Sequence, residues 1–393
     1  MKTLVNTLAE DTVKELVAVR RDLHQHPETA FEEVRTSGVV AERLRALGLD
    51  VRTGVAKTGV LATVRGARPG KTVLLRADMD ALPIQEENDT PYRSRVDGKM
   101  HACGHDCHTS VLLGVATQLV REASELKGAV RLCFQPAEEC GGGAETMIAE
   151  GALADPRPDA AFGLHVWQDL DLGQVGVTPG PFMAAVDEFT VTVKGKGAHA
   201  AMPHLGVDPV VCLAHMVTAL QTIASRSASP FAEVVVSVTQ VRAGTAFNII
   251  PERAWMNGTV RVFEPGLWEA LPGHFERIVR GVAGAFGCTV EIDFHRFNQP
   301  TVNDPAMAAL AREAAAEVVG PGNVRDDVRT MGGEDFSAFL RQVPGCFIAV
   351  GSRNAARGLV HGHHHPRFDV DEACLAIGAE VLLRTTRKFL GVA

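Results

Sequence analysis

The sequence predicts an α/β protein in which a mainly parallel sheet forms one domain and a smaller α+β unit with a ferredoxin-like order is inserted into it. Short apolar runs alternate with amphipathic helical segments, and this alternation changes near residue 184. The chain has 393 residues, and single cores stop growing at roughly 250–300 residues. The predicted domains are therefore an outer one, 1–183 with 298–393, and an insert, 184–297.

The first part of the outer domain begins with two helices, predicted at 8–24 and 32–47, because apolar residues recur there at helical spacing. Gly48 ends the second helix. The elements predicted next are strand 60–64, strand 72–77, helix 109–121, strand 129–135, a short helix through Met147 and Ile148, and strand 160–167. Strands and helices in this order are typical of a mainly parallel sheet.

The insert has its own order of elements. They are predicted as strand 186–195, helix 208–225, strands 232–241 and 252–263, helix 267–286 and strand 289–294. This β-α-β-β-α-β order is ferredoxin-like and self-contained. The outer domain then resumes with helix 305–319, loop 330–336, a strand near 347–350 and a terminal helix from 371.

Composition restricts the classes of function. The formal net charge is -8 at pH 7 and there is no basic stripe, which argues against nucleic acid and anionic membranes as partners. No apolar run approaches the ~20 residues of a membrane helix. The first six residues lack the apolar segment of a secretory signal, so we expect a cytoplasmic location. The even number of cysteines, 8, is no indication of disulfides in such a chain.

The segment 100–108, Met-His-Ala-Cys-Gly-His-Asp-Cys-His, contains thiolate, imidazole and carboxylate donors in one predicted loop. Cys103 and His105 are separated by one residue and can ligate a metal from the same side of an extended loop. Other candidate donors, His165 and the cluster 361–365, come from separate parts of the chain. Such a mixed set suits zinc, nickel, cobalt or manganese.

A closed structural zinc site is the alternative for this segment. It would use Cys103, Cys107, His105 and His108. Compact structural sites usually pair two Cys-x-x-Cys knuckles, and the sequence has no second knuckle.

Two adjacent glutamates, Glu138 and Glu139, follow strand 129–135 and precede a run of three glycines. A pair of this kind can divide two roles, one residue holding metal and the other moving protons. If Glu139 binds metal, Glu138 can take a proton from the metal-bound water and hand it to a leaving amine. An acidic turn alone would indicate only a solvated surface, but its place between a strand and glycines favours close packing around a bound group.

The insert contains three further candidates. His199 lies in the glycine-rich segment 195–204, before a predicted helix start near Asp208, where an anion or oxyanion can bind. Asn248 and Arg261 are candidate binders of a carboxylate.

These stretches together resemble the metal-dependent amidohydrolases that include hippurate hydrolase, N-acyl-amino-acid deacylases and plant auxin–amino-acid conjugate hydrolases, within the aminoacylase/carboxypeptidase superfamily. The resemblance extends along the whole chain. The matching stretches are 20–28, 78–83, 100–108, 135–139, 163–165, the His199 segment, 248–251, 331–336 and 364–369.

The resemblance implies a set of site residues. It implies two divalent metal ions (Mn, Zn, Co or Ni) ligated by Cys103, His105, Glu139, His165 and His364, with the cysteine as the bridging ligand. Glu138 matches the general base, and Asp80 matches a carboxylate that steadies the site. His199 matches a histidine that polarises the scissile carbonyl, in some relatives from a partner subunit. Asn248 and Arg261 match substrate-contacting positions, and the insert matches a lid that often dimerises.

The function expected from this resemblance is hydrolysis of the amide bond of N-acyl amino acids, such as hippurate-like or acetylated substrates. A bridging hydroxide would attack the acyl carbonyl, with Glu138 as the base. The expected partners are this small molecule and a second copy of the chain in a homodimer or larger homo-oligomer. The alternatives are a dipeptidase or carboxypeptidase on the same di-metal site and a non-catalytic metal or peptide binder, against which the intact Glu138 argues.

Overall fold

A computed structural model describes residues 8–392. The first six residues, on which the expectation of a cytoplasmic location partly rests, lie outside this range. The chain divides into two compact units. Unit 1 comprises residues up to 182, 302–329 and from 335 onward, and unit 2 comprises 183–301 and 330–334. Unit 2 thus includes the short segment 330–334 in addition to a continuous stretch close to the predicted insert.

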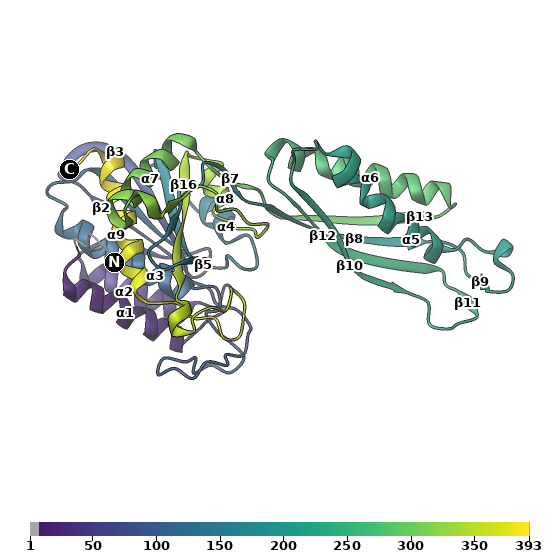
Figure 1. Ribbon diagram of the computed structural model, residues 1–393, viewed down its shortest axis with the longest axis horizontal. Coiled ribbons are helices and arrows are strands. Elements are labelled where there is room, and N and C mark those ends of the chain that lie inside the picture. The colour runs from purple at the N-terminus through teal and green to yellow at the C-terminus, as the bar shows by residue number, and fades with distance from the viewer. Residues whose placement is uncertain (1–7, 393) are drawn as a thin grey trace. The chain divides into compact units, whose positions relative to one another are not determined.

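Unit 1 is built on an eight-stranded mixed sheet with the order β1-β2-β4-β3-β5-β16-β6-β15 (Figure 1). The strands are β1 (Val51–Val55), β2 (Gly59–Arg65), β3 (Arg68–Asp78), β4 (Lys127–Gln135), β5 (Ala160–Asp171), β6 (Val175–Gly176), β15 (Val324–Arg325) and β16 (Gly345–Arg353). Pairing is parallel from β4 through β3 and β5 to β16, and antiparallel at β1–β2, β2–β4 and β6–β16. The structure therefore confirms a mixed α/β fold with a mainly parallel sheet.

Helices of unit 1 pack around this sheet and bury its central strands. They are α1 (Glu10–Gln25), α2 (Val34–Ala46), α3 (His105–Arg121), α4 (Gly143–Ala149), α7 (Pro305–Val319), α8 (Ser337–Leu340) and α9 (Ala373–Leu390). Helix α9 contacts β3, β5 and β16, and it also packs against α1, α3 and α7. The core contains Leu75, Leu132 and Ile348 from three of the central strands. No helix among the described residues combines the length and apolarity needed to cross a bilayer.

Parallel pairing aligns the carboxyl ends of the central strands. Asp78 at the end of β3 lies opposite Gln135 at the end of β4, and His165 of β5 lies opposite Ala349 of β16. Segments that follow these strands emerge at one edge of the sheet, where α/β proteins place their sites.

Two sequence predictions need correction. The segment up to residue 108 is not all loop, because α3 begins at His105. Gly104 has φ 93, and its carbonyl accepts hydrogen bonds from the N–H groups of Cys107 and His108, which closes the first turn of the helix. Strand β1 was not predicted, since three of its five residues are exposed and show no apolar run.

Unit 2 contains a four-stranded antiparallel sheet with the order β10-β12-β8-β13. Its main elements follow along the chain as β8 (Ala185–Lys194), α5 (Pro209–Leu220), β10 (Val234–Ala243), β12 (Arg253–Val262), α6 (Pro265–Ala285) and β13 (Thr289–Asn298), which is a β-α-β-β-α-β order. Helices α5 and α6 cover one face of this sheet (Figure 1). Between them and the strands lies a separate apolar core that includes Phe189, Met256 and Phe275.

Candidate metal centre

The turn at Gly104 directs two candidate ligands from one short segment. Cys103 precedes the turn, and His105 is the first residue of α3. The positive φ of Gly104 suits glycine. A Cβ atom at this position would lie 2.3 Å from Cγ2 of Val166, so the backbone approaches β5 as closely as only glycine allows.

The acidic turn, residues 136–139, follows β4 and carries Glu138 and Glu139. Asp80, which lies just beyond β3, binds this turn through its carboxylate. Its Oδ1 accepts from the N–H of Glu138 and its Oδ2 from the N–H of Glu139, each at 3.0 Å. Asp80 is buried, and its Oδ1 also lies 3.3 Å from Nδ1 of His105. One carboxylate therefore fixes both the turn and the histidine.

The two remaining histidines come from segments far apart in the sequence, His165 from β5 and His364 from the loop after β16. His165 donates from Nδ1 to the carbonyl of Val166 at 2.5 Å, which leaves Nε2 facing Sγ of Cys103 at 3.4 Å. The backbone N–H of His364 donates to the carbonyl of Ala102 at 2.8 Å. Nε2 of His364 lies 3.2 Å from Oε1 of Glu139.

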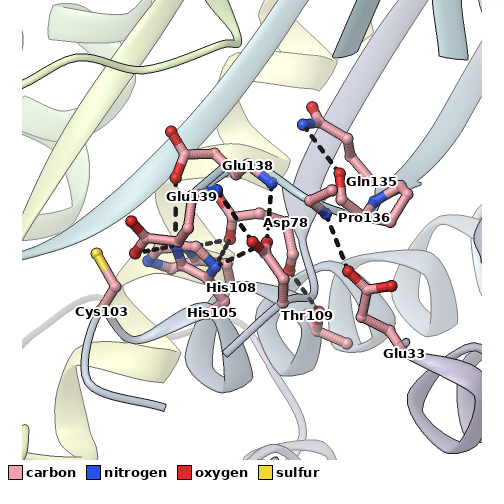
Figure 2. Close-up of polar contacts among 12 residues, drawn as sticks. Glu33, Asp78, Cys103, His105, His108, Thr109, Gln135, Pro136, Glu138 and Glu139 are labelled. Atoms are coloured by element: carbon pink, nitrogen blue, oxygen red, sulfur yellow. Dashed lines mark hydrogen bonds and ion pairs between the residues drawn. The ribbon is translucent and has the colours of Figure 1, made fainter. Parts of the chain in front are cut away.

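These side chains converge. Their ligand atoms form overlapping groups within 4.8 Å: Cys103 with His105 and His165, Cys103 with Glu139 and His364, and His105 with Glu138 and Glu139. Figure 2 shows Cys103, His105 and Glu139 gathered at one place, with Glu138 beside them. Cys103 and His105 are each members of two of these groups, so the groups overlap in one cluster of donors.

The donor set fits divalent metal ions. Nε2 of His105 is buried and has no hydrogen-bonding partner among residues 8–392, and Oε1 of Glu139 lies 3.9 Å away from it. Buried polar atoms are nearly always satisfied, so an orphaned imidazole nitrogen facing a carboxylate and a thiol is what a metal site looks like without its ion. Thiolate, imidazole and carboxylate together suit first-row transition ions.

The charges around the donors favour a cation. Burial raises the pKa of the Cys103 thiol well above its ordinary value, and the charges of Glu139 and Glu138 raise it further. Burial works against protonation of His105, yet the charge of Asp78, with Asp80 and Glu139, raises its pKa to about 10. Burial lowers the pKa of His165 well below its ordinary value, which keeps a lone pair available for a metal. A bound cation would offset the excess of negative charge.

A buried ionic network supports the site from within the sheet, and sequence reasoning missed most of it. Arg76 of β3 donates to Oδ2 of Asp78 at 2.5 Å and to Oδ1 of Asp335 at 2.9 Å, and Asp335 also accepts from the side chain of Gln135. All three charged side chains are at most 1% exposed. An arginine inside the apolar run 73–78 was the one available signal, because such a residue needs a buried acidic partner.

The alternative of a closed zinc site is not supported. His108 has both ring nitrogens engaged, since Nε2 accepts from the N–H of Val166 and Nδ1 donates to Oδ1 of Asp78. Cys107 is fully buried in the apolar core. Among the described residues, no metal-holding group includes Cys107.

The candidates of unit 2 lie at two ends of its sheet. His199 is on β9 (Ala198–His199), which pairs with β11 (Ile249–Ile250), and the carbonyl of Asn248 accepts from Ala200. Both His199 and Asn248 are exposed. Arg261 is half-buried at the other end, where its Nη1 donates to the carbonyl of Met331 at 3.3 Å.

The distance between Arg261 and His199 follows from the register of β12 against β8. Arg261 pairs with Val186, whereas the His199 segment begins beyond Lys194. The intervening eight residues of β8 span about 26 Å at the rise of a strand. Within a single copy of unit 2, Arg261 therefore lies far from both His199 and Asn248.

The site combines thiol, imidazole and carboxylate donors with a second carboxylate next to them. It lies at the carboxyl ends of parallel strands. This combination is typical of metal-dependent hydrolases. The sequence profile of Peptidase family M20/M25/M40 matches residues 74–388. The chain belongs to this family, which confirms the resemblance seen in the sequence.

Named relatives act on different amide substrates. N-acetylcysteine deacetylase of Bacillus subtilis (strain 168) is 40% identical over 93% of this chain and 94% of its own. Thermostable carboxypeptidase 2 of Saccharolobus solfataricus is 39% identical over 96% of both chains. The crystal structure of a dinuclear metal-binding M20 peptidase from Bacillus subtilis has a TM-score of 0.85 and 36% identity, covering 98% of this chain and 100% of that one.

The family and its relatives make this chain a metal-dependent amide hydrolase that uses divalent metal ions. Relatives at almost equal identity carry out deacetylation and peptide cleavage. Identity alone therefore does not select the substrate.

Proposed function

We propose that the chain hydrolyses the amide bond of N-acyl amino acids with hippurate-like or acetylated acyl groups. The observation that carries the proposal is the geometry of the acidic turn. Oε1 of Glu139 and Oε2 of Glu138 lie 3.9 and 4.0 Å from Nε2 of His105, but only Glu139 also belongs to the group with Cys103 and His364. Glu138 is 92% buried. A second carboxylate held beside a donor set suits a proton carrier.

The proposed ligands of two divalent ions (Mn, Zn, Co or Ni) are Cys103, His105, Glu139, His165 and His364. When bound, such ions polarise an amide carbonyl and increase the acidity of water. Glu138 accepts a proton from the attacking water and delivers it to the departing amide nitrogen. Asp80 keeps Glu138 in place by accepting a hydrogen bond from the backbone N–H of Glu138. The leaving group is then a neutral amine.

Unit 2 supplies the groups proposed to contact the substrate. His199, with an exposed ring, stabilises the oxyanion that develops on the acyl carbonyl. Arg261 is proposed to bind the free carboxylate, since a guanidinium presents two parallel N–H donors. Asn248, whose carbonyl accepts from the N–H of Ala200 beside His199, is likewise proposed to bind the free carboxylate.

The substrate class is tested with metal-free protein reloaded separately with Mn, Co, Zn or Ni. Hippurate, acetyl-amino acids, an auxin–amino-acid conjugate and simple dipeptides are each assayed for release of free amino acid. Metal-dependent release from the acylated substrates is the expected result. Cleavage of dipeptides alone would assign the site to a peptidase, which the carboxypeptidase relative makes the second candidate.

Replacing the proposed base separates catalysis from binding. We expect Glu138→Gln to lower kcat by about 10²–10⁴-fold, the usual contribution of a positioned general base. Metal content should stay near that of the wild type, because Glu139 remains. Glu145→Gln, on an exposed position of α4, removes the same charge and is the control. Unchanged kcat in Glu138→Gln would show that another group carries the proton. A wild type that binds ligand without any turnover, and a Glu138→Gln variant with the same ligand affinity, would support a binder instead.

A further inference from the structure

The acidic turn contains a residue in an unusual conformation. Ala137 has φ 56, in the left-handed region, and is fully buried. A non-glycine residue in this region is strained and persists only where its surroundings impose the conformation. The direction of the Glu138 side chain, one residue later, depends on this conformation.

The conformation of Ala137 is imposed by a carboxylate more than a hundred residues earlier in the chain. Oε1 of Glu33 accepts a hydrogen bond from the N–H of Ala137 at 3.0 Å, and Figure 2 shows Glu33 reaching the turn from below. The same oxygen accepts from the N–H of Phe31 at 3.0 Å, and Oε2 accepts from the hydroxyl of Thr58 at 2.6 Å. Phe31 also has a left-handed φ, 62. One carboxylate thus holds two strained backbone positions.

Glu33 and Asp80 together hold the whole turn. Three consecutive N–H groups, those of residues 137, 138 and 139, each donate to a carboxylate oxygen: the first to Glu33 and the next two to Asp80. Hydrogen bonds to charged acceptors are stronger than neutral ones. This arrangement leaves the turn little freedom to rotate.

Burial of Glu33 has a cost. Its side chain is fully buried, and burial raises the pKa of its carboxyl despite the hydroxyl of Thr58. An apolar side chain would avoid this cost but would leave the N–H of Ala137 buried without an acceptor.

We propose that Glu33 is a positioning residue, which acts through the backbone of Ala137 to aim the carboxylate of Glu138. The inference rests on the proposed role of Glu138. It adds the requirement that the side chain at position 33 accept the hydrogen bond from Ala137, whether or not that side chain is charged.

Two variants test the requirement. Glu33→Ala removes the acceptor, and we expect kcat to fall roughly 10²-fold, as for a displacement of about 1 Å at a reacting group. KM and metal content should change little. Glu33→Gln should restore most of kcat, because its Oε1 can accept from Ala137 and Phe31 while its Nε2 donates to the hydroxyl of Thr58.

Glu28→Ala is a matched control. Glu28 accepts from the N–H groups of Arg35 and Thr36 at 2.9 and 2.8 Å, at the start of the same helix α2, without contacting the acidic turn through its side chain. Its loss should lower the thermal midpoint by an amount similar to the loss of Glu33 and leave kcat near the wild-type value. Each variant is measured with the dipeptide or acylated substrate that the wild type cleaves best.

Amide hydrogen exchange of the peptide covering residues 134–141 gives a readout independent of turnover. Protection should be lost in Glu33→Ala and kept in Glu33→Gln and Glu28→Ala. Equal kcat in Glu33→Ala and Glu28→Ala, unchanged protection of the turn, or a loss of metal that matches the loss of activity would each overturn the inference. If Glu138→Gln is fully active while protection follows this pattern, the proposed function fails and the structural effect of Glu33 stands.

Discussion

Single residues with left-handed backbones shape the candidate metal centre. Gly104 has φ 93, Ala137 has φ 56 and His364 has φ 64. Each lies at or next to a proposed ligand or the proposed base. The local reversal in each segment lets side chains from neighbouring positions point into one small volume.

Gly104 offers a direct test of this dependence. In Gly104→Ala, the added Cβ would meet Cγ2 of Val166 at 2.3 Å, so the turn between Cys103 and His105 must shift. We expect metal content and the thermal midpoint both to fall, measured by elemental analysis and calorimetry.

Gly98→Ala is the control for backbone strain alone. Gly98 has φ 72, and a Cβ there would meet nothing within 4 Å. This variant should lose only about 1 kcal/mol of stability and keep its metal. Full metal content in Gly104→Ala would show that the close approach to Val166 is not needed.

The residues of the site could be predicted from sequence only in part. Donor types at short spacing marked Cys103, His105 and the acidic pair. The partners of these residues could not be found in the same way, because Arg76 and Asp335 are 259 positions apart and meet only in the folded chain. Glu33 lacked any signal, since a glutamate near a helix start usually faces solvent.

At the scale of elements, strongly periodic segments were predicted well and their ends were not. The apolar runs of β3, β4 and β5 indicated buried parallel strands, and the structure has them. The start of α3 was placed four residues late because the whole segment through His108 was interpreted as a loop. In the structure, the carboxylate of Asp106 in the first turn accepts from Nε of Arg20 and pairs with His24, both on α1. These contacts join residues far apart in the sequence, so the local pattern did not indicate them.

The contact between β8 and α6 contains a titratable group. Asp187 of β8 is fully buried, and its Oδ1 accepts from Nε1 of Trp268. Its Oδ2 has no hydrogen-bonding partner in the part of the chain that the structure describes. Burial raises its pKa from 3.8 to about 6, against the opposing effects of Trp268 and the nearby Arg296. Between these two pH values the folded chain binds more protons than the unfolded one, so the free energy of unfolding falls as pH rises.

Asp187→Asn should remove this dependence. The amide mimics the protonated carboxyl, so the variant should gain stability relative to the wild type as pH rises from 4 to 6, with no further change above that range. Urea unfolding followed by tryptophan fluorescence measures the difference, because Trp268 contacts the substituted group. Asp293→Asn on β13, at an exposed position, is the control. A constant difference between wild type and Asp187→Asn over this range would contradict the shifted pKa.

For the whole molecule, the geometry of unit 2 bears on how a complete site is assembled. His199 and Arg261 are separated by about the length of a strand, some 26 Å. A substrate as small as an N-acyl amino acid does not span that distance. If both residues contact one substrate, as proposed, they come from different copies of the chain.

A mixture of two inactive variants tests this consequence. Arg261→Ala and His199→Ala chains are unfolded, mixed in equal amounts and refolded together. Random pairing into dimers should restore about a quarter of the wild-type activity, in sites that combine an intact Arg261 of one copy with an intact His199 of another. Each variant refolded alone is the control. Absence of any recovery, with mixed dimers demonstrated by mass, would place both residues in one chain.

The proposed ligands extend from Cys103 to His364, and α1 is held to the far end of the chain, where Nη2 of Arg20 contacts Oδ1 of Asp369 at 2.8 Å and the N–H of Leu8 donates to Glu380. During synthesis, all five proposed donors therefore exist only once the ribosome has passed His364. A nascent chain that stops within unit 2 carries four of the five, so we expect the complete metal site to form only after unit 2 has been made.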